Sequence, residues 1–336
     1  MPHFSPFLAP VMRCVEATPT PYSLTMKLPP LHRLSKTLAI FSLAACATLA
    51  TSVFAGTPDP KTPAVTTPEP EPWLHALLQL DFSDHYITPR GLDVENRGLI
   101  FQPLFLVFAD LYSDKTGFLQ DVTLTGGVWS SIHSRKSGAN PGHWNEFDPI
   151  GGLAFKFADY WKFETNYTAF DSMVDSYPTS QHLELKLSFD DTKFLGAFAL
   201  HPYVAYWNEL VNKATVAFDP ATSLGSYYFT FGIDPSVKLG PVKVEFPNFI
   251  NIVGKDFYQK FDGTGGGSGL AVFCSEVKLS VPLSFVPKDL GFWSLYAGVK
   301  YYHLNNTGLL DGNMVLTAHE HTKDLWQIHG GISIFF

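Results

Sequence analysis

Apolar and polar side chains alternate along short runs from His75 to the end of the chain. In the run HLELKLSF, from His182 to Phe189, every second residue is apolar and the others are polar. A period of two predicts a β-strand with one apolar and one polar face. Applied along the chain, the same pattern predicts twelve strands, over 76–88, 98–111, 118–132, 146–158, 160–171, 180–190, 199–210, 225–234, 241–253, 270–283, 292–303 and 325–336.

The connections between these strands are alternately short and long. Stretches such as YSDKTG and DTKFLG are short, whereas HSRKSGANPGHWN, GKDFYQKFDGTGGGSG and the stretch 304–324 are long. Single-chain bacterial outer-membrane barrels have an even number of strands, short periplasmic turns and longer extracellular loops. The sequence therefore predicts an all-β fold, a single transmembrane antiparallel β-barrel of about 12 strands.

Aromatic residues on the apolar rows gather at the ends of the predicted strands. Membrane barrels carry such residues at both lipid–water boundaries. We expect an extracellular belt of Tyr86, Tyr167, Tyr206, Tyr227, Tyr301 and Trp326, and a periplasmic belt of Phe108, Phe157, Trp161, Phe189, Trp293 and Phe336.

The composition fits a barrel in lipid. Charged residues make up 16% of the chain, aromatics 15%, and the mean hydropathy is +0.05. A soluble domain carries about 25% charged residues. The formal net charge of −8 argues against a nucleic-acid partner. Beyond residue 55 Cys274 is the sole cysteine, which allows neither an intrachain disulfide nor a cysteine zinc site.

The segment before the predicted barrel, residues 74–336, has the features of an export leader. Residues 26–55 combine a positive start, an apolar stretch and the sequence VFA, which predicts a signal peptide cleaved after Ala55. Residues 1–25 are then expected to be an over-extended N-terminus or a long n-region. LAAC, ending at Cys46, is an alternative lipidation site, and an uncleaved anchor is a third option. The proline-rich residues 56–73 predict a periplasmic linker. Either cleavage predicts export, and together with the predicted barrel this gives the cell outer membrane as the expected destination.

The last predicted strand, LWQIHGGISIFF, ends on Phe336. A terminal Phe that closes an alternating strand resembles the signal by which bacterial assembly machinery recognises outer-membrane proteins. More broadly, DHYITPRGL (84–92), IFQPLF (100–105) and GGVWSS (126–131) resemble the putative porins of the TorF type. This resemblance covers the first three strands. It implies an outer-membrane channel and names no substrate.

The polar rows of the strands are expected to face the barrel lumen. They predict a porin-like channel for passive diffusion of small polar solutes or ions, because rings of charged side chains tune what a pore admits. Loss of the leader removes more basic than acidic residues, which favours cations. The candidate pore-lining residues are Gln79, Asp81, His85, Lys162, Glu164, Asn166, His182, Glu184, Lys186, Lys243, Glu245, Glu276, Lys278, Lys300, Gln327 and His329.

Two alternatives stay open at this stage. Ion pairs across the lumen predict a plugged barrel with a structural or adhesive role. A barrel enzyme acting on lipids needs a histidine on an apolar row, and His303 is the best candidate. The HEH at His319–His321 lacks a third ligand at regular spacing, so no metal or other cofactor is expected. The partners expected are outer-membrane lipid and lipopolysaccharide, the barrel-assembly machinery, small polar solutes and, as an option, further copies of the chain.

Overall fold

The computed structural model describes residues 72–211, 227–255, 257–260, 265–317 and 322–336. The predicted leader, the cleavage position at Ala55, the lipidation alternative at Cys46 and His319–His321 lie outside these residues.

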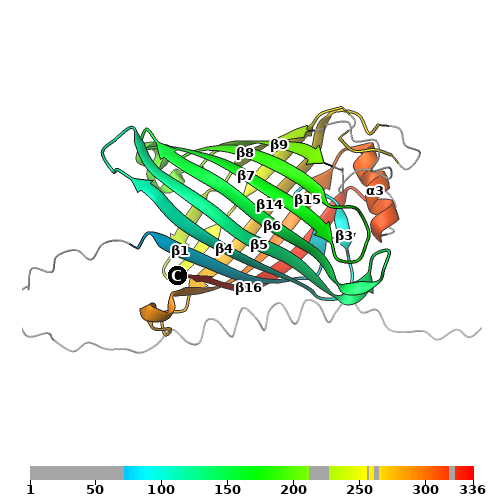
Figure 1. The fold of residues 1–336 in the computed structure, drawn as a ribbon, viewed down its shortest axis with the longest axis horizontal. Coiled ribbons are helices and arrows are strands. Elements are labelled where there is room, and N and C mark those ends of the chain that lie inside the picture. Colours follow the sequence, from blue (N-terminus) through cyan, green and yellow to red (C-terminus); the bar gives the residue numbers. More distant parts are fainter. Residues whose placement is uncertain (1–71, 212–226, 256, 261–264, 318–321) are drawn as a thin grey trace, which may run out of the picture. The chain divides into compact units, whose positions relative to one another are not determined.

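Twelve antiparallel strands form one closed barrel, as the alternation of the sequence predicted (Figure 1). Strand β1 pairs with both β4 and β16, and β14 pairs with β15, so the ring has no open edge to expose to lipid. The twelve are β1 Leu74–Ser83, β4 Ile100–Ser113, β5 Leu119–Ser137, β6 Gly142–Phe157, β7 Trp161–Ser172, β8 Ser180–Phe189, β9 Tyr203–Val211, β10 Tyr227–Ile233, β13 Asn248–Val253, β14 Gly269–Pro282, β15 Phe292–Leu304 and β16 Asp324–Phe335.

The last residues close this ring against the first strand. The amide of Phe336 donates to the carbonyl of Ala76 at 2.8 Å, and the amide of Ala76 donates back at 3.2 Å. Phe336 therefore lies at the same end of the barrel as the start of β1. We call this end, which carries the short connections, the turn end.

A proline divides one of the predicted strands, and one of the predicted turns contains a further strand. The expected strand 241–253 is split at Phe246–Pro247 into β12 (Val242–Glu245) and β13, and the expected turn PSVKLG contains β11 (Ser236–Leu239). A proline has no N–H to donate to the ladder, so it interrupts a strand. The amide of Phe246 donates to the carbonyl of Pro235 at 2.9 Å, next to the paired residues Ser236 of β11 and Glu245 of β12.

Other connections also differ from the prediction. The stretch around 133–145 was expected as a long loop, but β5 and β6 continue through most of it, and their pairing reaches Ser137 and Gly142. Helix α2 (Thr192–Leu195) with the 3₁₀ turn η2 (Gly196–Phe198) joins β8 to β9, and η3 (Lys288–Leu290) joins β14 to β15. No helix among the described residues is long and apolar enough to cross a membrane.

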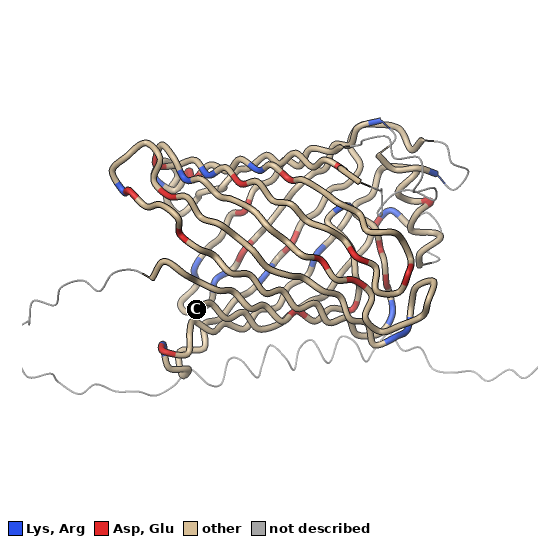
Figure 2. The backbone as a smooth tube through the Cα atoms, viewed as in Figure 1, with Lys and Arg blue, Asp and Glu red and all other residues tan. Residues whose placement is uncertain are grey.

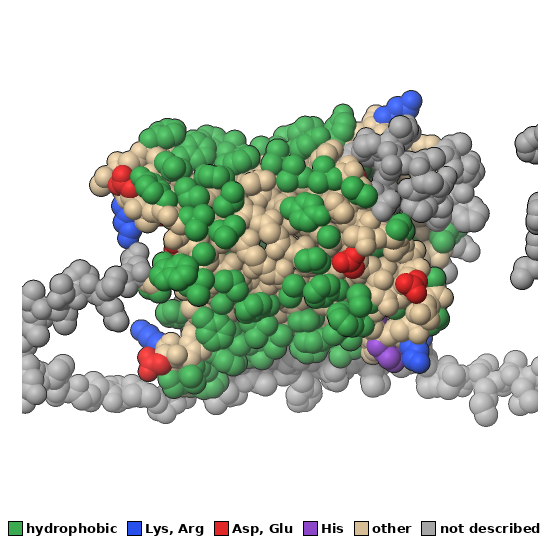
Figure 3. All heavy atoms as spheres, viewed as in Figure 1, with side chains coloured by type: hydrophobic (Ala, Val, Ile, Leu, Met, Phe, Trp, Pro, Cys, Tyr) green, Lys and Arg blue, Asp and Glu red, His purple; other side chains and the backbone are tan. Residues whose placement is uncertain are grey.

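The outer face of the barrel is apolar. Figure 3 shows hydrophobic side chains over much of the visible face, with charged ones mainly toward the two ends. Aromatic side chains pair at both ends, as Trp161 with Phe189 (ring centroids 4.7 Å apart) and Tyr301 with Trp326 (4.8 Å). This is the arrangement that lipid-facing strands require.

The opposite end of the barrel, the loop end, is closed by segments that fold over and into it. Strands β2 (Tyr86–Ile87) and β3 (Asp93–Glu95) form a small hairpin there, next to helix α3 (Thr307–Thr317) (Figure 1). The prediction that the first strand reaches residue 88 is wrong. Strand β1 ends at Ser83, because the carboxylate of Asp84 accepts the amide of Ile328 at 2.9 Å and the chain then turns inward.

Candidate functional site: a cavity in the barrel lumen

The barrel encloses a cavity of about 670 Å³. It follows β15 from Ser294 to Tyr302, which is most of the length of that strand. Charged residues lie along the strands midway between the two ends of the barrel, as the coloured positions in Figure 2 show. Inside, charged side chains from β1, β12, β14, β15 and β16 line one wall, which we call the charged wall: Asp81, Lys243, Glu245, Glu276, Lys278, Lys300 and His329.

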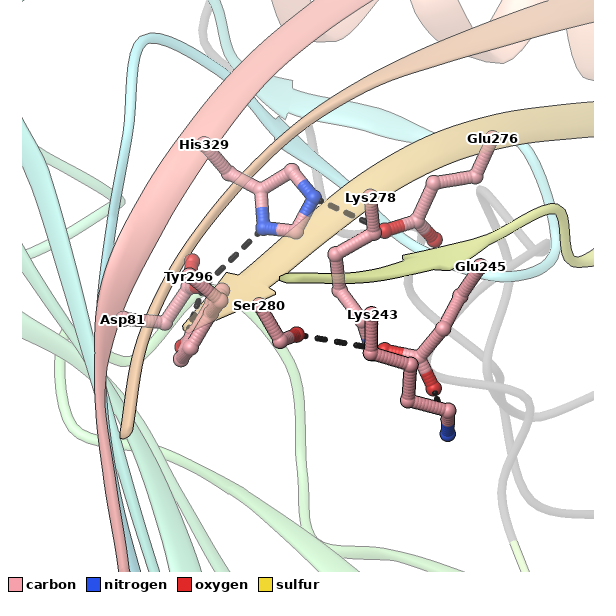
Figure 4. Close-up of polar contacts among 8 residues, drawn as sticks. All are labelled: Asp81, Lys243, Glu245, Glu276, Lys278, Ser280, Tyr296 and His329. Carbon is pink, nitrogen blue, oxygen red and sulfur yellow. Dashed lines mark hydrogen bonds and ion pairs between the residues drawn. The ribbon is translucent and has the colours of Figure 1, made fainter. Parts of the chain in front are cut away.

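His329 bridges two carboxylates on the charged wall (Figure 4). Its Nδ1 lies 3.1 Å from Oδ2 of Asp81 and its Nε2 lies 2.9 Å from Oε1 of Glu276. Both ring nitrogens of a histidine donate only in the protonated form. Tyr296 donates to the same Oδ2 of Asp81 at 2.7 Å. The bridge therefore ties β16 to β1 and β14 inside the lumen.

Glu245 gathers a second set of contacts on the charged wall. Its carboxylate lies 2.7 Å from Nζ of Lys243 and 3.0 Å from Nζ of Lys278. The hydroxyl of Ser280 donates to it at 3.3 Å. The charges of the two lysines are thus shared with one carboxylate, and acidic and basic groups alternate along this wall.

The other side of the cavity, which we call the aromatic wall, is largely apolar. Side chains from neighbouring strands follow one another here, because Leu104 pairs with Trp129 and Trp129 pairs with Asp148 across β4, β5 and β6. Ile150 and Phe170 also line this wall. Asp148 is its one carboxylate among the residues lining the cavity, and only 5% of it is exposed.

The loop-end boundary of the cavity is formed by the segment that follows β1. Arg90 lies 4% exposed, with its guanidinium carbon 4.8 Å from the ring centre of Phe170 and 5.0 Å from that of Trp207. The hydroxyl of Tyr86 donates to Glu146 at 2.6 Å. The expected place of Tyr86 in the outer aromatic belt is therefore wrong, because its ring lies inside the barrel.

Hydrogen bonds and apolar packing hold this inward segment in place. Asn313 of α3 accepts the amide of Asp93 and donates to the carbonyl of Gly91, both at 3.0 Å. Gly91 has a φ of +82°, and a Cβ there would meet Leu304 at 2.8 Å. Leu92 packs in the same buried cluster as Leu304. Buried, mainly apolar side chains therefore pack together at the loop end of the barrel.

The predicted pore-lining residues fall into three groups. Those that line the cavity are Gln79, Asp81, Lys243, Glu245, Glu276, Lys278, Lys300, Gln327 and His329. Those on the inward rows of β7 and β8, away from the cavity lining, are Lys162, Glu164, Asn166, Glu184 and Lys186. His182 and His85 are placed differently, as described next.

His182 and His85 belong to the closed loop end. His182 is fully buried, with its Nε2 3.0 Å from a carboxylate oxygen of Glu209, and it packs against Phe170 and Trp207. His85 lies beyond the end of β1, with its Nδ1 3.0 Å from Asp84. That hydrogen bond and the charge of Asp84 raise the pKa of His85 above its ordinary value, against the effect of its partial burial. Neither residue is among those that line the cavity.

Sequence reasoning missed Arg90, Trp129, Asp148 and Tyr296, all of which line the cavity. Trp129 and Tyr296 are aromatic, and aromatic residues were expected on the outer face. Arg90 lies between predicted strands, where alternation carries no information. One signal was present: Glu146 and Asp148 sit two residues apart at the start of a predicted strand, and a strand places such residues on one face.

Three side chains with ligand atoms for a cation lie together away from this cavity, at the β8–β9 turn. Asp190, Asp191 and His201 each offer one ligand atom, all within 4.8 Å of one another. The carboxylate of Asp191, however, already accepts the amides of Leu200 and His201, the latter at 2.9 Å. Burial disfavours its charged form, but these backbone donors hold the pKa of Asp191 below its ordinary value. The geometry thus describes a carboxylate that stabilises a turn.

Comparison with known proteins gives structural likenesses only. No protein-family model and no curated protein matches the chain. Outer membrane phospholipase A from Escherichia coli is 13% identical with a TM-score of 0.39, over 77% of this chain and 92% of that one. The translocator domain of autotransporter NalP from Neisseria meningitidis is 10% identical with a TM-score of 0.36, over 90% and 95%. A porin is 12% identical with a TM-score of 0.31, over 78% and 99%. These likenesses are too distant to assign the activity of any of these proteins to this chain.

The class of protein follows from the architecture itself. A closed antiparallel barrel of twelve strands, with an apolar outer face and a polar lumen, is a transmembrane barrel of the bacterial outer-membrane type. Its location is the cell outer membrane. In such barrels the short turns face the periplasm and the longer loops face outward.

Proposed function

We propose that this protein is a porin-like channel through which small polar solutes or ions diffuse passively across the outer membrane. The observation that carries the proposal is the cavity, which runs along β15 from Ser294 to Tyr302 between charged side chains of both signs. Such a lining replaces part of the hydration of a polar solute as it passes. The inward segment at the loop end is then the constriction of the channel.

The resemblance to TorF-type porins supports the same proposal. Arg90, Gln102 and Trp129 belong to the three stretches that carry this resemblance, and all three line the cavity. The assignment to that type of porin remains a prediction. We also propose that outer-membrane lipid and lipopolysaccharide cover the apolar outer face, and that the assembly machinery reads the strand ending at Phe336.

Single-channel recording tests the proposal. Refolded wild-type protein in planar bilayers is expected to give discrete current steps. Substitution Ser294→Trp places a large ring in the cavity, so we expect the unit conductance to fall. The matched control is Leu295→Trp, because Leu295 lies on the lipid-facing row and is 44% exposed. No discrete steps from folded wild-type protein, or equal conductance of the two variants, would contradict the channel and favour a plugged structural or adhesive barrel.

One observation supports a different class of function, an enzyme that acts on lipids. His303 lies on the outward row of β15, and its Nδ1 is 2.8 Å from a carboxylate oxygen of Asp324. A histidine oriented by a carboxylate is two-thirds of a hydrolytic triad. Ser275 pairs with Tyr301 and Phe273 pairs with His303, so the serine is a diagonal neighbour on the same face. Among the described residues no hydrogen bond joins Ser275 to His303.

A lipid-release assay decides between the two classes. Because the third contact of a triad is missing, we expect phospholipid vesicles to show the same background release of fatty acid with wild-type protein and with His303→Ala. Release by the wild type that falls to background in His303→Ala and in Ser275→Ala would establish the enzyme. Trp326→Ala, an outward residue near His303, serves as the surface control.

A further inference from the structure

The strongest unexplained feature of the cavity is the carboxylate of Asp148. It lies on the aromatic wall and is 5% exposed, and its Oδ1 has no hydrogen-bond partner within the described part of the chain. A buried carboxylate oxygen without a partner is costly, and proteins rarely leave one without a functional reason. Because the cavity borders this residue, a cationic ligand can supply a counter-charge to the carboxylate.

Around Asp148 the described residues supply more carboxyl groups than basic groups. Glu146 is two residues away on the same side of β6, and its charge and that of Asp148 act on each other. Arg90 is the cation that acts on both carboxylates. That one guanidinium is also near Glu209. Glu146, Asp148 and Glu209 thus share one guanidinium, and a ligand group with a positive charge favours the ionised form of the Asp148 carboxyl group.

The side chains next to Asp148 favour an organic cation. Trp129 pairs with Asp148 across the β5–β6 ladder, and the ring of Tyr86 lies 5.5 Å from that of Trp129. The faces of such rings attract cations. Phe170 and Trp207 already hold the guanidinium of Arg90 in this way. A small divalent metal ion prefers six or more oxygen ligands, whereas Asp148 is the one carboxylate among the residues that line this wall.

We propose that the aromatic wall binds the ammonium group of a small organic cation, with Asp148 as its counter-ion and Trp129 and Tyr86 as its aromatic contacts. This inference rests on the proposed channel and names the chemical class of one solute that the channel takes up. The cavity volume of about 670 Å³ is in the range of small-molecule sites. The carboxylates of the charged wall already contact His329 or a lysine, so the ammonium group binds on the other side.

Equilibrium binding of choline to the refolded full-length protein in detergent tests the inference. Choline chloride replaces sodium chloride stepwise so that the ionic strength stays constant, and tryptophan fluorescence is the signal. Its neutral isostere, 3,3-dimethylbutan-1-ol, separates the charge from the shape. We expect saturable binding of choline that is about tenfold tighter than that of the isostere, since a charged contact is worth that much.

Two carboxylate variants locate the site. Asp148→Asn is expected to weaken choline binding about tenfold and to leave the isostere unchanged. Glu245→Gln is the matched control, because Glu245 also lines the cavity but already pairs with two lysines. We expect its choline affinity to stay within about twofold of that of the wild type. Folding of Asp148→Asn is judged by heat-modifiable migration. If this variant does not fold, the affinities for choline and for its isostere are measured on the wild type and on Trp129→Leu instead, and that comparison decides.

The inference is overturned by any of three results: no saturable choline binding, equal affinities for choline and the isostere, or an unchanged affinity in Asp148→Asn. Its failure is separate from that of the channel. Current steps without choline binding leave the channel in place and remove the ammonium site. Choline binding without current steps leaves the site in place and removes the channel.

Discussion

At the scale of single residues, Arg90 links the inward segment to the barrel wall. Its guanidinium packs against Phe170 of β7 and Trp207 of β9, and its backbone carbonyl accepts the hydroxyl of Tyr258. Cation–π contacts that are removed from water are worth about 2 kcal/mol. The side chain of Arg90 is therefore a principal contact that keeps the loop end closed.

Substitution Arg90→Ala is expected to raise the unit conductance or the open fraction of the channel. The segment loses its contacts with both rings, about 2 kcal/mol, and moves more freely in the lumen. Single-channel recording measures this change. Arg97→Ala is the control, because Arg97 is an exposed arginine of the same connection. If Arg90→Ala conducts as the wild type does, the segment does not limit the current.

At the scale of elements, the connection between β8 and β9 depends on one carboxylate. Helix α2 and the turn η2 are short, and neither has a buried residue of its own. Asp191 accepts the amide of Leu200 with both oxygens and that of His201 with one. This side chain therefore fixes where the chain re-enters the barrel as β9.

Substitution Asp191→Ala is expected to lower the free energy of unfolding by about 2 kcal/mol, since it removes the charged acceptor of the amides of Leu200 and His201. The pKa of Asp191 is lowered by folding, so its contribution is complete above the unfolded pKa of about 4 and is lost as the pH falls through the folded pKa. Urea unfolding at pH 7 and at several values below pH 4 should show the gap to wild type narrowing on acidification. Asp289→Ala, in the exposed turn η3, is the control. A gap that does not change with pH would contradict this role.

At the scale of the whole molecule, the closed ring separates two environments. Every second side chain of a strand faces lipid and the others face the lumen, so apolar and charged residues follow each other along one strand without conflict. The ring also lets distant parts of the chain meet: His329 contacts Asp81 across the β1–β16 closure, and Tyr258 contacts Arg90. The cavity and its two different walls exist only because the ring is closed.

The strands were predictable because their pattern is local. Alternation located most of the expected spans within a few residues of the observed strands, but the first span ends too late, the third ends too early, and the ninth is split at Pro247. The charged wall was predictable for the same reason, since Glu276, Lys278 and Lys300 sit on regular polar rows. Asp148 and Trp129 were not predicted to face the lumen. Their inward row mixes aromatic, apolar and acidic residues, so alternation does not distinguish the lumen face from the lipid face there.

The sequence by itself determined the barrel: a period of two, turn signals and aromatic strand ends suffice, since lipid and lumen act on each residue separately. Only the tertiary structure decided what fills the loop end. Arg90, Asn313 and Tyr258 are far apart in the chain, and their contacts follow from the curvature of the ring and the inward course of one connection. The partner that a buried side chain meets across a lumen is a property of the closed fold, and no local pattern records it.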